Sequence, residues 1–273
     1  MIGWPLGHSL SAAMHNAAFK ALGVEAEYKL FPLRPEELNP FLENLDTSGI
    51  AGLNVTVPYK EKALKFVKLD KESAFLKTVG AINTMARKNN AWHGFNTDIP
   101  GFRRHLKEHF EPRAKKAAIL GCGGACRAVA FVLAQEEAAE IRLFDIEPEK
   151  PAGIVRMIKG LFPDRALSAV DSVEKLDIGG SDLLVNATPV GLKQDDPSLV
   201  PGSMLRPGQF VYDLIYNPRE TKLLAAAQKA GAQTANGLGM LLYQGMYSFE
   251  IWTGRQAPEG VMREALDSAL AGH

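Results

Sequence analysis

The amino-acid sequence predicts an α/β protein with more than one domain. Short apolar runs of strand composition alternate with amphipathic helical patterns, as in the βαβ units that build a mostly parallel sheet. The chain has 273 residues, which is longer than one domain usually is. A polar segment with a proline, residues 111–116, separates an irregular first part from a regular second part, and we interpret it as a linker.

In the first part, the periodicity of apolar residues predicts elements of modest length. The helix that begins at Ser11, for example, repeats apolar residues every three or four positions. The expected helices cover residues 11–22, 35–45 and 60–66. The expected strands cover residues 27–30, 52–56, 81–86 and 91–96, the last two as a hairpin.

The second part has a more regular rhythm, which is typical of a parallel sheet with helical crossovers. A helix is expected at residues 100–110, before the linker. After the linker, the expected strands are 117–120, 141–144, 183–186 and 210–213, and the expected helices are 125–135 and 151–161. Two further helical stretches, broken at residues 253–258, fill residues 247–271.

Composition and charge exclude several classes of function. Hydrophobic residues make up 46% of the chain and charged residues 23%, as in ordinary globular proteins. Lys plus Arg and Asp plus Glu both number 31, so the net charge of zero gives no reason to expect nucleic acid or an anionic membrane as a partner. No apolar run reaches the roughly 18 residues of a membrane span, and the first residues lack the features of a signal peptide. Cys122 and Cys126 complete neither a disulfide framework nor a zinc site, so we expect a cytoplasmic protein without a bound metal.

A glycine-rich loop lies between the expected strand at 117–120 and the expected helix at 125–135. Gly121 permits a tight turn, Gly123 lets the backbone approach a pyrophosphate, and the small Ala128 lets the helix lie close to the strand. The N–H groups at the helix start then receive the phosphates. Plain glycine-rich turns share this pattern, but its place between strand and helix favours a Rossmann-type, doubly wound dinucleotide-binding domain. The predicted contacts are Gly121, Gly123, Gly124 and Ala125.

An acidic residue follows the next strand. Asp145 stands 24 residues after Gly121, where a carboxylate can accept hydrogen bonds from the adenosine ribose hydroxyls. Glu147 and Glu149 follow it, and no arginine does. Like charges a few ångströms apart repel by on the order of 1–4 kcal/mol at surface dielectrics, which disfavours a 2′-phosphate. The sequence therefore predicts NAD in preference to NADP, with NADP still possible; the alternative is that Asp145 only caps a turn.

A loop near the N-terminus carries two serine hydroxyls. Ser9 and Ser11 are spaced so that both hydroxyls can face one ligand. A structural role fits equally well, because Ser11 could cap the helix that follows. His8 and His15 flank this loop, and we interpret both as structural residues because a histidine beside a turn usually is.

Further polar residues follow the expected strands of the first part. The segment from Asn54 onward alternates like a strand, which places Asn54 and Thr56 on one face and Lys60 just beyond the strand end. Polar turns also occur at residues 80–84 and 94–98.

These segments together resemble the shikimate dehydrogenase family, and the resemblance covers almost the whole chain. Any one match would be weak evidence, but eight in the family's order argue against chance. The matching stretches are H-S-L-S at His8–Ser11, N-V-T-V-P-Y-K at Asn54–Lys60, G-A-I-N-T at Gly80–Thr84, N-T-D at Asn96–Asp98, the glycine loop, N-A-T-P-V-G at Asn186–Gly191, Y-D-L-I-Y-N-P at Tyr212–Pro218 and N-G-L-G-M-L-L-Y-Q at Asn236–Gln244.

The resemblance implies an oxidoreductase of the shikimate pathway that interconverts 3-dehydroshikimate and shikimate with NAD(P). Lys60 and Asp98 match the family's catalytic pair. The positions that match substrate contacts are Ser9, Ser11, Thr56, Asn83, Tyr216 and Gln244, with Asn54 close by. The positions that match cofactor contacts, besides the glycine loop, are Asn186, Thr188, Leu214, Gly237 and Met240. The resemblance also implies a substrate domain over residues 1–103, completed by 237–273, and a dinucleotide domain over 104–236, in a monomer or homodimer.

The sequence departs from the family pattern at two places. Ala12 stands where many members have proline, which should affect only how the first helix begins. Phe144-Asp145-Ile146 occupies the place of an Asn-Arg-Thr whose arginine meets the 2′-phosphate of NADP. The chain therefore resembles an NAD-preferring branch, some of whose members also take quinate, whereas Ser11 in place of threonine favours shikimate.

The residue types suit the reduction of a ring ketone, which needs a hydride on carbon and a proton on oxygen. A cationic Lys60 would polarise the carbonyl and supply the proton, and Asp98 would orient the amine or share its proton. Without the resemblance, Lys60 would fit a solvated lysine equally well and Asp98 a turn residue. No arginine occurs among the matched substrate positions, so we expect the substrate carboxylate to meet the hydroxyls of Ser9, Ser11 and Tyr216.

Three alternatives stay open. A quinate dehydrogenase, or a dual quinate/shikimate enzyme using NAD, would have the same scaffold. A dinucleotide-binding sensor without catalysis would not need Lys60 and Asp98. A folate-linked dehydrogenase of similar architecture fits less well, because the matched loops offer no extended aromatic site for a pterin.

Overall fold

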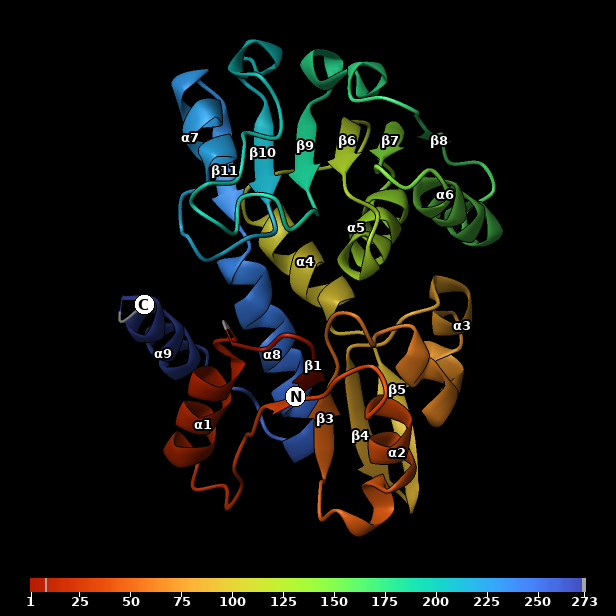
Figure 1. Ribbon diagram of the computed structural model, residues 1–273, viewed down its shortest axis with the longest axis vertical. Helices are drawn as coiled ribbons and strands as arrows, with labels where there is room; N and C mark the ends of the chain where they lie inside the picture. Colours follow the sequence, from red (N-terminus) through yellow and green to blue (C-terminus); the bar gives the residue numbers. More distant parts are fainter. Residues whose placement is uncertain (8, 272–273) are drawn as a thin grey trace. The chain divides into compact units, whose positions relative to one another are not determined.

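The computed structural model describes residues 1–7 and 9–271, which form two compact units (Figure 1). Unit 1 consists of Met1–Gly101 with Leu241–His273, and unit 2 of Phe102–Met240. The boundaries fall inside two helices, α4 (Asp98–Lys107) and α8 (Leu238–Thr253). No helix of the described residues is both long and apolar enough to cross a lipid bilayer.

Unit 2 contains a six-stranded parallel sheet with the order β11-β10-β9-β6-β7-β8 (Figure 1). Its strands are β6 (Lys116–Leu120), β7 (Glu140–Phe144), β8 (Leu167–Ala169), β9 (Leu183–Asn186), β10 (Phe210–Asp213) and β11 (Gln233–Asn236). The direction of chain progression reverses between β6 and β9. Dinucleotide-binding α/β domains have this order and bind their ligands at the carboxyl ends of the strands beside the reversal. The predicted fold class is confirmed.

The helices of unit 2 connect these parallel strands. They are α5 (Gly124–Gln135), α6 (Glu149–Leu161) and α7 (Lys222–Lys229), with short 3₁₀ turns η4 (Glu174–Leu176), η5 (Ile178–Gly180) and η6 (Gly202–Met204). Because helical crossovers cover a parallel sheet, its interior strands can be apolar on both faces. Accordingly, β9 and β10 are buried along their whole length. The sequence predicted both of these strands but not α7, β8 or β11.

Unit 1 is built around a three-stranded antiparallel sheet with the order β3-β4-β5. The strands are β3 (Gly52–Asn54), β4 (Thr84–Lys88) and β5 (Ala91–Phe95). β4 and β5 form the predicted hairpin, and the two residues of its turn, Asn89 and Asn90, adopt positive φ as a tight hairpin turn requires. A second, parallel pair joins β1 (Ile2–Gly3) to β2 (Phe31–Pro32).

The remaining helices of unit 1 are short, apart from α1 (Ser11–Ala21) and α9 (Glu259–Ala271), which pack against each other. The others are α2 (Leu38–Glu43), α3 (Leu76–Val79) and the 3₁₀ turns η1 (Leu45–Thr47), η2 (Lys62–Phe66) and η3 (Lys71–Ser73). The helices predicted at residues 35–45 and 60–66 are thus reduced to α2 and η2, and the helix predicted from residue 247 begins earlier, at Leu238.

One further prediction for unit 1 was wrong, and the alternative role of Ser11 as a helix cap does not hold. Residues 27–30 form no strand, because the backbone of Tyr28 bonds to the side chain of Asn16 instead of to a neighbouring strand. Asn16 Oδ1 accepts from Tyr28 N at 2.7 Å, and Asn16 Nδ2 donates to Tyr28 O at 3.1 Å. Ser11 does not cap the first helix: it is the first residue of α1, and its Oγ has no hydrogen-bond partner.

Candidate functional site

A buried ion pair lies in unit 1. Lys60 Nζ donates to Asp98 Oδ2 at 2.5 Å, and the two residues are 9% and 5% exposed. The small sheet brings them together: Lys60 O accepts from Ile82 N just before β4, and Asp98 opens α4 just after β5. Because few water molecules reach such a pair, its electrostatic attraction is stronger than at the surface, and loss of one partner leaves a costly buried charge.

Asp98 is held at both carboxylate oxygens. Oδ2 accepts from Lys60, and Oδ1 accepts from Asn83 Nδ2 at 2.9 Å. Gln244 Oε1, which α8 supplies, lies 3.4 Å from the same Asn83 nitrogen. The structure therefore brings together four residues that the sequence proposed for the site: Lys60, Asn83, Asp98 and Gln244.

The amide of Asn54 is also buried in this unit, at 2% exposure. Its Nδ2 lies within hydrogen-bond distance of Asn83 O, Thr84 Oγ1 and Ser248 Oγ, at 3.2, 3.0 and 3.1 Å. Its Oδ1 accepts from the Tyr28 hydroxyl at 2.7 Å. The predicted contact residue Asn54 thus bonds mainly to protein groups.

The serine loop and Thr56 complete the predicted substrate residues of unit 1. Ser9 is half-buried, and its Oγ lies 3.5 Å from Met1 Sδ. Ser11 is 1% exposed, with an unpartnered hydroxyl that a polar ligand would satisfy. Thr56 is half-buried just after β3, although the strand was predicted to include it. His8 lies outside the described residues.

Sequence reasoning missed three hydroxyls near the ion pair. Tyr28, Thr84 and Ser248 are 8%, 0% and 0% exposed, and all belong to the hydrogen-bonded group around Asn54 and Asn83. The available signal was the position of Ser248 within an otherwise apolar run, where a polar residue needs a buried partner.

In unit 2, the glycine loop has the geometry that a phosphate-binding turn needs. Gly121 has φ +86°, and a Cβ there would lie 2.6 Å from Thr188 Cγ2 and 2.8 Å from Ala187 C. A Cβ on Gly123 would meet nothing within 4 Å, so the backbone surface at Gly123 is open. Gly124 and Ala125 begin α5, whose first N–H groups suit an anion.

Asp145 lies directly beside this loop. Its Oδ2 accepts from Cys122 N at 2.7 Å and its Oδ1 from Glu147 N at 3.0 Å. Glu147 also binds the Lys150 ammonium, and this hydrogen bond raises the pKa of Lys150. The carboxylate of Asp145 therefore fixes the end of β7 to the glycine loop and adds negative charge beside it.

The loops after β9 and β10 are held by a second buried polar group. Asn186, which is 0% exposed, donates to Asp213 Oδ1 at 2.9 Å and accepts from the Thr188 N–H and hydroxyl. Asp213 also accepts from the Thr221 hydroxyl at 2.7 Å, and burial raises the pKa of this carboxyl. The predicted cofactor residues Asn186 and Thr188 thus shape the loop that contacts Gly121.

The remaining predicted residues of unit 2 lie on the loop after β10 and around the start of α8. A Cβ on Gly237 would stand 2.0 Å from Leu214 O, so only glycine fits there. Met240, near the start of α8, is 8% exposed. Tyr216, on the loop after β10, is partly buried, and this burial raises the pKa of its hydroxyl. With the open turn at Gly123 and the acceptor at Asp145, the carboxyl edge of this sheet suits a pyrophosphate and an adenosine ribose.

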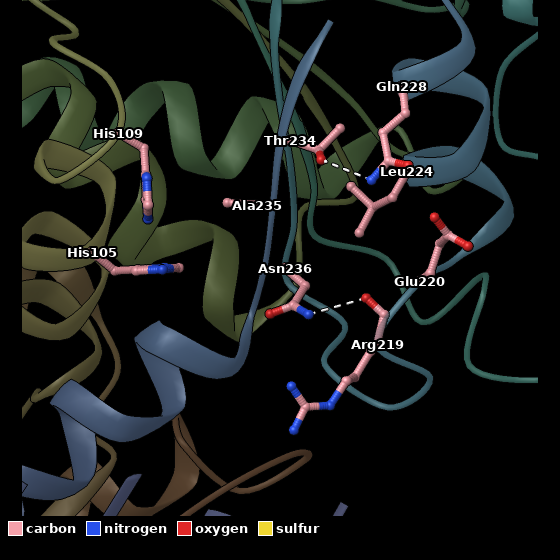
Figure 2. Close-up of a pocket in the computed structure, with 9 residues that line it drawn as sticks. All are labelled: His105, His109, Arg219, Glu220, Leu224, Gln228, Thr234, Ala235 and Asn236. Carbon is pink, nitrogen blue, oxygen red and sulfur yellow. Dashed lines mark hydrogen bonds between the residues drawn. The ribbon is translucent and has the colours of Figure 1, made fainter. Parts of the chain in front are cut away.

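A separate cavity of about 280 Å³ lies beside β11 in unit 2, and none of the predicted site residues lines it (Figure 2). His105 and His109 form one wall and, with Glu108, bring possible metal-ligand atoms within 4.8 Å of one another. The two rings meet edge to face at 89°, with centroids 5.0 Å apart, and His105 Nδ1 bonds to Tyr212 Oη at 2.6 Å. These contacts explain the positions of both rings by packing against β10, so we assign the cluster no role in the site.

Two family models match the two end regions of this chain, and curated relatives match nearly its whole length. The shikimate dehydrogenase substrate binding domain matches residues 1–85, and the shikimate 5′-dehydrogenase C-terminal domain matches residues 237–266. The curated shikimate dehydrogenase (NADP(+)) of Methanopyrus kandleri is 43% identical over 274 residues, which cover 97% of this chain and 93% of the relative. The chain belongs to the shikimate dehydrogenase family. It is therefore an oxidoreductase, as the sequence motifs predicted.

Solved structures of shikimate dehydrogenases and of a quinate dehydrogenase have the same fold. A shikimate dehydrogenase in complex with NADP+ superposes with a TM-score of 0.89 at 38% identity, covering 98% of this chain and 94% of that one. Shikimate 5-dehydrogenase from Listeria monocytogenes, in complex with shikimate and NAD, gives 0.86 at 35%, with 97% and 94% covered. Quinate dehydrogenase from Corynebacterium glutamicum, in complex with NAD, gives 0.88 at 29%, with 98% and 97% covered. The fold is thus shared by enzymes that differ in cofactor and in substrate.

Proposed function

We propose that this chain catalyses the reversible, NAD(P)-dependent reduction of 3-dehydroshikimate to shikimate, with Lys60 and Asp98 as the acid–base pair. The observation that carries the proposal is the buried 2.5 Å contact between Lys60 Nζ and Asp98 Oδ2 in the unit that matches the substrate binding domain. Family membership and the shikimate dehydrogenase names of the relatives support the substrate class.

The chemistry proposed for the pair follows from its surroundings. A nicotinamide dinucleotide supplies the hydride when it is bound. Lys60 donates a hydrogen bond to the ketone oxygen, polarises the carbonyl and delivers a proton from Nζ. Asp98 holds the amine in place through the contact between Lys60 Nζ and Asp98 Oδ2. Burial of both residues strengthens these interactions relative to a solvated pair.

The hydroxyls and amides of the predicted set suit a polyhydroxylated ring. We propose that Ser9 and Ser11 of unit 1 bind the substrate carboxylate, and that Thr56 and Gln244 of the same unit bind ring hydroxyls. The unpartnered Oγ of the buried Ser11 supports this role. A site that offers such groups discriminates against a substrate that leaves them without partners. Asn54 and Asn83 belong to the same site, although their amides bond largely to protein groups.

NAD in preference to NADP is the finer part of the proposal. The carboxylate of Asp145 lies against the glycine loop and would repel a 2′-phosphate beside it, whereas the charge of Glu147 is balanced by the Lys150 ammonium. The relatives do not decide the question, since some are named for NADP and others were solved with NAD.

The test is an oxidation assay of shikimate and of quinate, each with NAD and with NADP. We expect the highest kcat/KM for shikimate with NAD, and Lys60→Ala should abolish nearly all of it. A higher kcat/KM with NADP would overturn the cofactor proposal, and full activity of Lys60→Ala would remove the lysine from the mechanism. A higher kcat/KM for quinate would favour the second candidate function, a quinate dehydrogenase. The structural similarity to a quinate dehydrogenase, with a TM-score of 0.88, supports this candidate.

A further inference from the structure

A chain of buried hydrogen bonds connects the Tyr28 hydroxyl to the Asp98 carboxylate through three intermediate side chains. Tyr28 Oη donates to Asn54 Oδ1 at 2.7 Å, and Asn54 Nδ2 donates to Thr84 Oγ1 at 3.0 Å. Thr84 Oγ1 donates to Asn83 Oδ1 at 3.0 Å, and Asn83 Nδ2 donates to Asp98 Oδ1 at 2.9 Å. Every residue of this orienting chain is less than 10% exposed.

The orientation of the Asn83 amide is fixed by a neighbouring group that can only donate a hydrogen bond. The Thr97 backbone N–H, which can only donate, meets Asn83 Oδ1 at 2.7 Å. This contact identifies that atom as the amide oxygen, so the NH₂ group of Asn83 faces Asp98. A flipped Asn83 would point its oxygen at the carboxylate and its NH₂ at another donor.

The direction of the first bonds is fixed in the same way. The Asn83 backbone oxygen, which can only accept, lies 3.2 Å from Asn54 Nδ2. Asn54 Oδ1 therefore faces Tyr28, and the tyrosine hydroxyl must be the donor. Burial raises the pKa of Tyr28, which keeps this hydroxyl protonated. The bonds from Tyr28 to Asn54, from Asn54 to Thr84 and from Asn83 to Asp98 therefore run toward Asp98. The single hydroxyl hydrogen of Thr84, between them, can be donated to Asn83 Oδ1 at 3.0 Å or to Ser248 Oγ at 2.8 Å.

Tyr28 itself is held at three places. The Asn16 amide binds its backbone N–H and C=O. The His15 ring stacks on its ring with centroids 4.5 Å apart and planes 10° from parallel. The hydroxyl binds Asn54. Burial lowers the pKa of His15 to about 3, so the stacked imidazole is neutral near neutral pH and adds no charge beside the tyrosine.

We propose that Tyr28 and Thr84 are positioning residues of the catalytic site, which act on the Lys60–Asp98 pair through the orienting chain. They hold the Asn83 amide in one orientation, so that Asp98 Oδ1 is always occupied and Oδ2 stays directed at Lys60. This inference rests on the proposed function of the pair. It assigns a role to Tyr28, His15 and Asn16, which the substrate and cofactor motifs leave unexplained.

Three variants test the proposal in the full-length protein. Tyr28→Phe removes the first donor and keeps the ring that stacks on His15. Thr84→Val removes the central hydroxyl and keeps the shape of the side chain, whereas Thr84→Ser keeps the hydroxyl. Tyr59→Phe is the matched control, because Tyr59 is also buried in unit 1 but donates to Leu33 O, outside the orienting chain.

We expect kcat for shikimate oxidation to fall about five- to ten-fold in Tyr28→Phe and Thr84→Val, roughly the effect of one hydrogen bond. Thr84→Ser and Tyr59→Phe should keep kcat within about two-fold of the parent. The dissociation constant of the dinucleotide, measured by fluorescence, should be the same in all four variants. If Thr84→Val fails to fold, Tyr28→Phe with its control decides the question.

Two results would overturn the inference: parental kcat in both Tyr28→Phe and Thr84→Val, or an equal loss in Tyr59→Phe. Its failure can be told apart from failure of the proposed function by two reference measurements. If the parent protein oxidises shikimate and Lys60→Ala does not, unchanged kcat in the Tyr28 and Thr84 variants rejects only the positioning role. If the parent protein does not oxidise shikimate, the proposed function is rejected first.

Discussion

The two units build their sites from different parts of the chain. In unit 1 the candidate site consists of buried side chains that bond to one another, from Lys60 and Asp98 to Asn83. In unit 2 the proposed dinucleotide site consists mainly of backbone, with Gly121 and Gly123 forming the turn at the start of α5. Proton transfer needs particular functional groups in fixed orientations, whereas a pyrophosphate needs N–H groups and open space. Changes of side chain should therefore affect turnover in unit 1, and changes of backbone shape should affect folding and binding in unit 2.

The largest effect is expected for Lys60→Ala. Loss of the only proposed proton donor should lower kcat by about 10²–10⁴-fold, the usual range for a general acid. The same change leaves the Asp98 carboxylate buried without its ammonium, so a lower melting temperature should accompany it. Lys62→Ala, which removes an exposed lysine from η2, is the control and should keep kcat within about two-fold. An equal loss of kcat in both variants would contradict the role of Lys60.

The next effect concerns backbone shape in unit 2. Gly121→Ala forces an L-residue to φ +86° and places its Cβ 2.8 Å from the backbone of Ala187. We expect a loss of about 3 kcal/mol in the free energy of unfolding by urea, since strain and overlap both contribute. Gly208→Ala is the matched control, because Gly208 also has positive φ, +76°, but a Cβ there meets nothing within 4 Å. It should lose about 1 kcal/mol, the strain alone, and equal losses would show that the contact with Ala187 costs nothing.

A third prediction concerns the pH dependence of stability, to which the buried His15 of unit 1 contributes. Burial lowers the pKa of His15 from 6.5 to about 3, so between these values the unfolded chain binds a proton that the folded chain does not. The stability of the folded state should therefore fall as pH falls, by about 1.4 kcal/mol per pH unit for this one residue. In His15→Phe, which keeps an aromatic ring against Tyr28, the slope of unfolding free energy between pH 4 and pH 6 should be smaller by about that amount. Identical slopes in the two proteins would mean that His15 is not shielded from protonation.

The smallest effect is expected for cofactor choice. Asp145→Asn removes a negative charge but keeps an oxygen that can accept from Cys122 N, so the glycine loop should stay in place. We expect the ratio of kcat/KM for NADP to that for NAD to rise about ten-fold, within the range of repulsion between like charges near a surface. Asp164→Asn, at an exposed position of the same unit, should leave the ratio unchanged. An unchanged ratio in Asp145→Asn as well would place the ribose away from this carboxylate.

The sequence predicted those elements best whose residues are buried on both sides. The bounds predicted for β9 and β10 agree with the structure, because strands covered on both faces read as short uninterrupted apolar runs. β11 (Gln-Thr-Ala-Asn) was missed because it is a polar edge strand without such a run. The strand predicted at residues 27–30 failed for another reason: the Asn16 side chain replaces the neighbouring strand, and no local pattern reveals such a substitute.

The residues of the candidate site also differ in whether a local sequence pattern reveals them. The motifs proposed Lys60, Asp98 and the glycine loop, since each has a characteristic local sequence at the end of a strand, and the structure brings Lys60 and Asp98 into contact. The orienting chain could not be predicted, because its links connect residues far apart in sequence: Tyr28 to Asn54 spans 26 positions, and Ser248, beside Thr84, lies 164 positions from it. Buried hydroxyls acquire their partners only through the tertiary fold, so their role is visible only in three dimensions.

The open backbone at Gly123 shows that folding and ligand binding can place different demands on one residue. A methyl group at this position would touch no atom of the folded protein, and the backbone there, at φ −77° and ψ −167°, suits any residue. Folding alone therefore places no demand on position 123, and a screen for thermal stability would accept alanine. The phosphate contact that we propose here would need a close approach to the main chain, and it is this contact that would require a hydrogen atom in that direction. On the proposed function, glycine at position 123 serves the ligand rather than the fold.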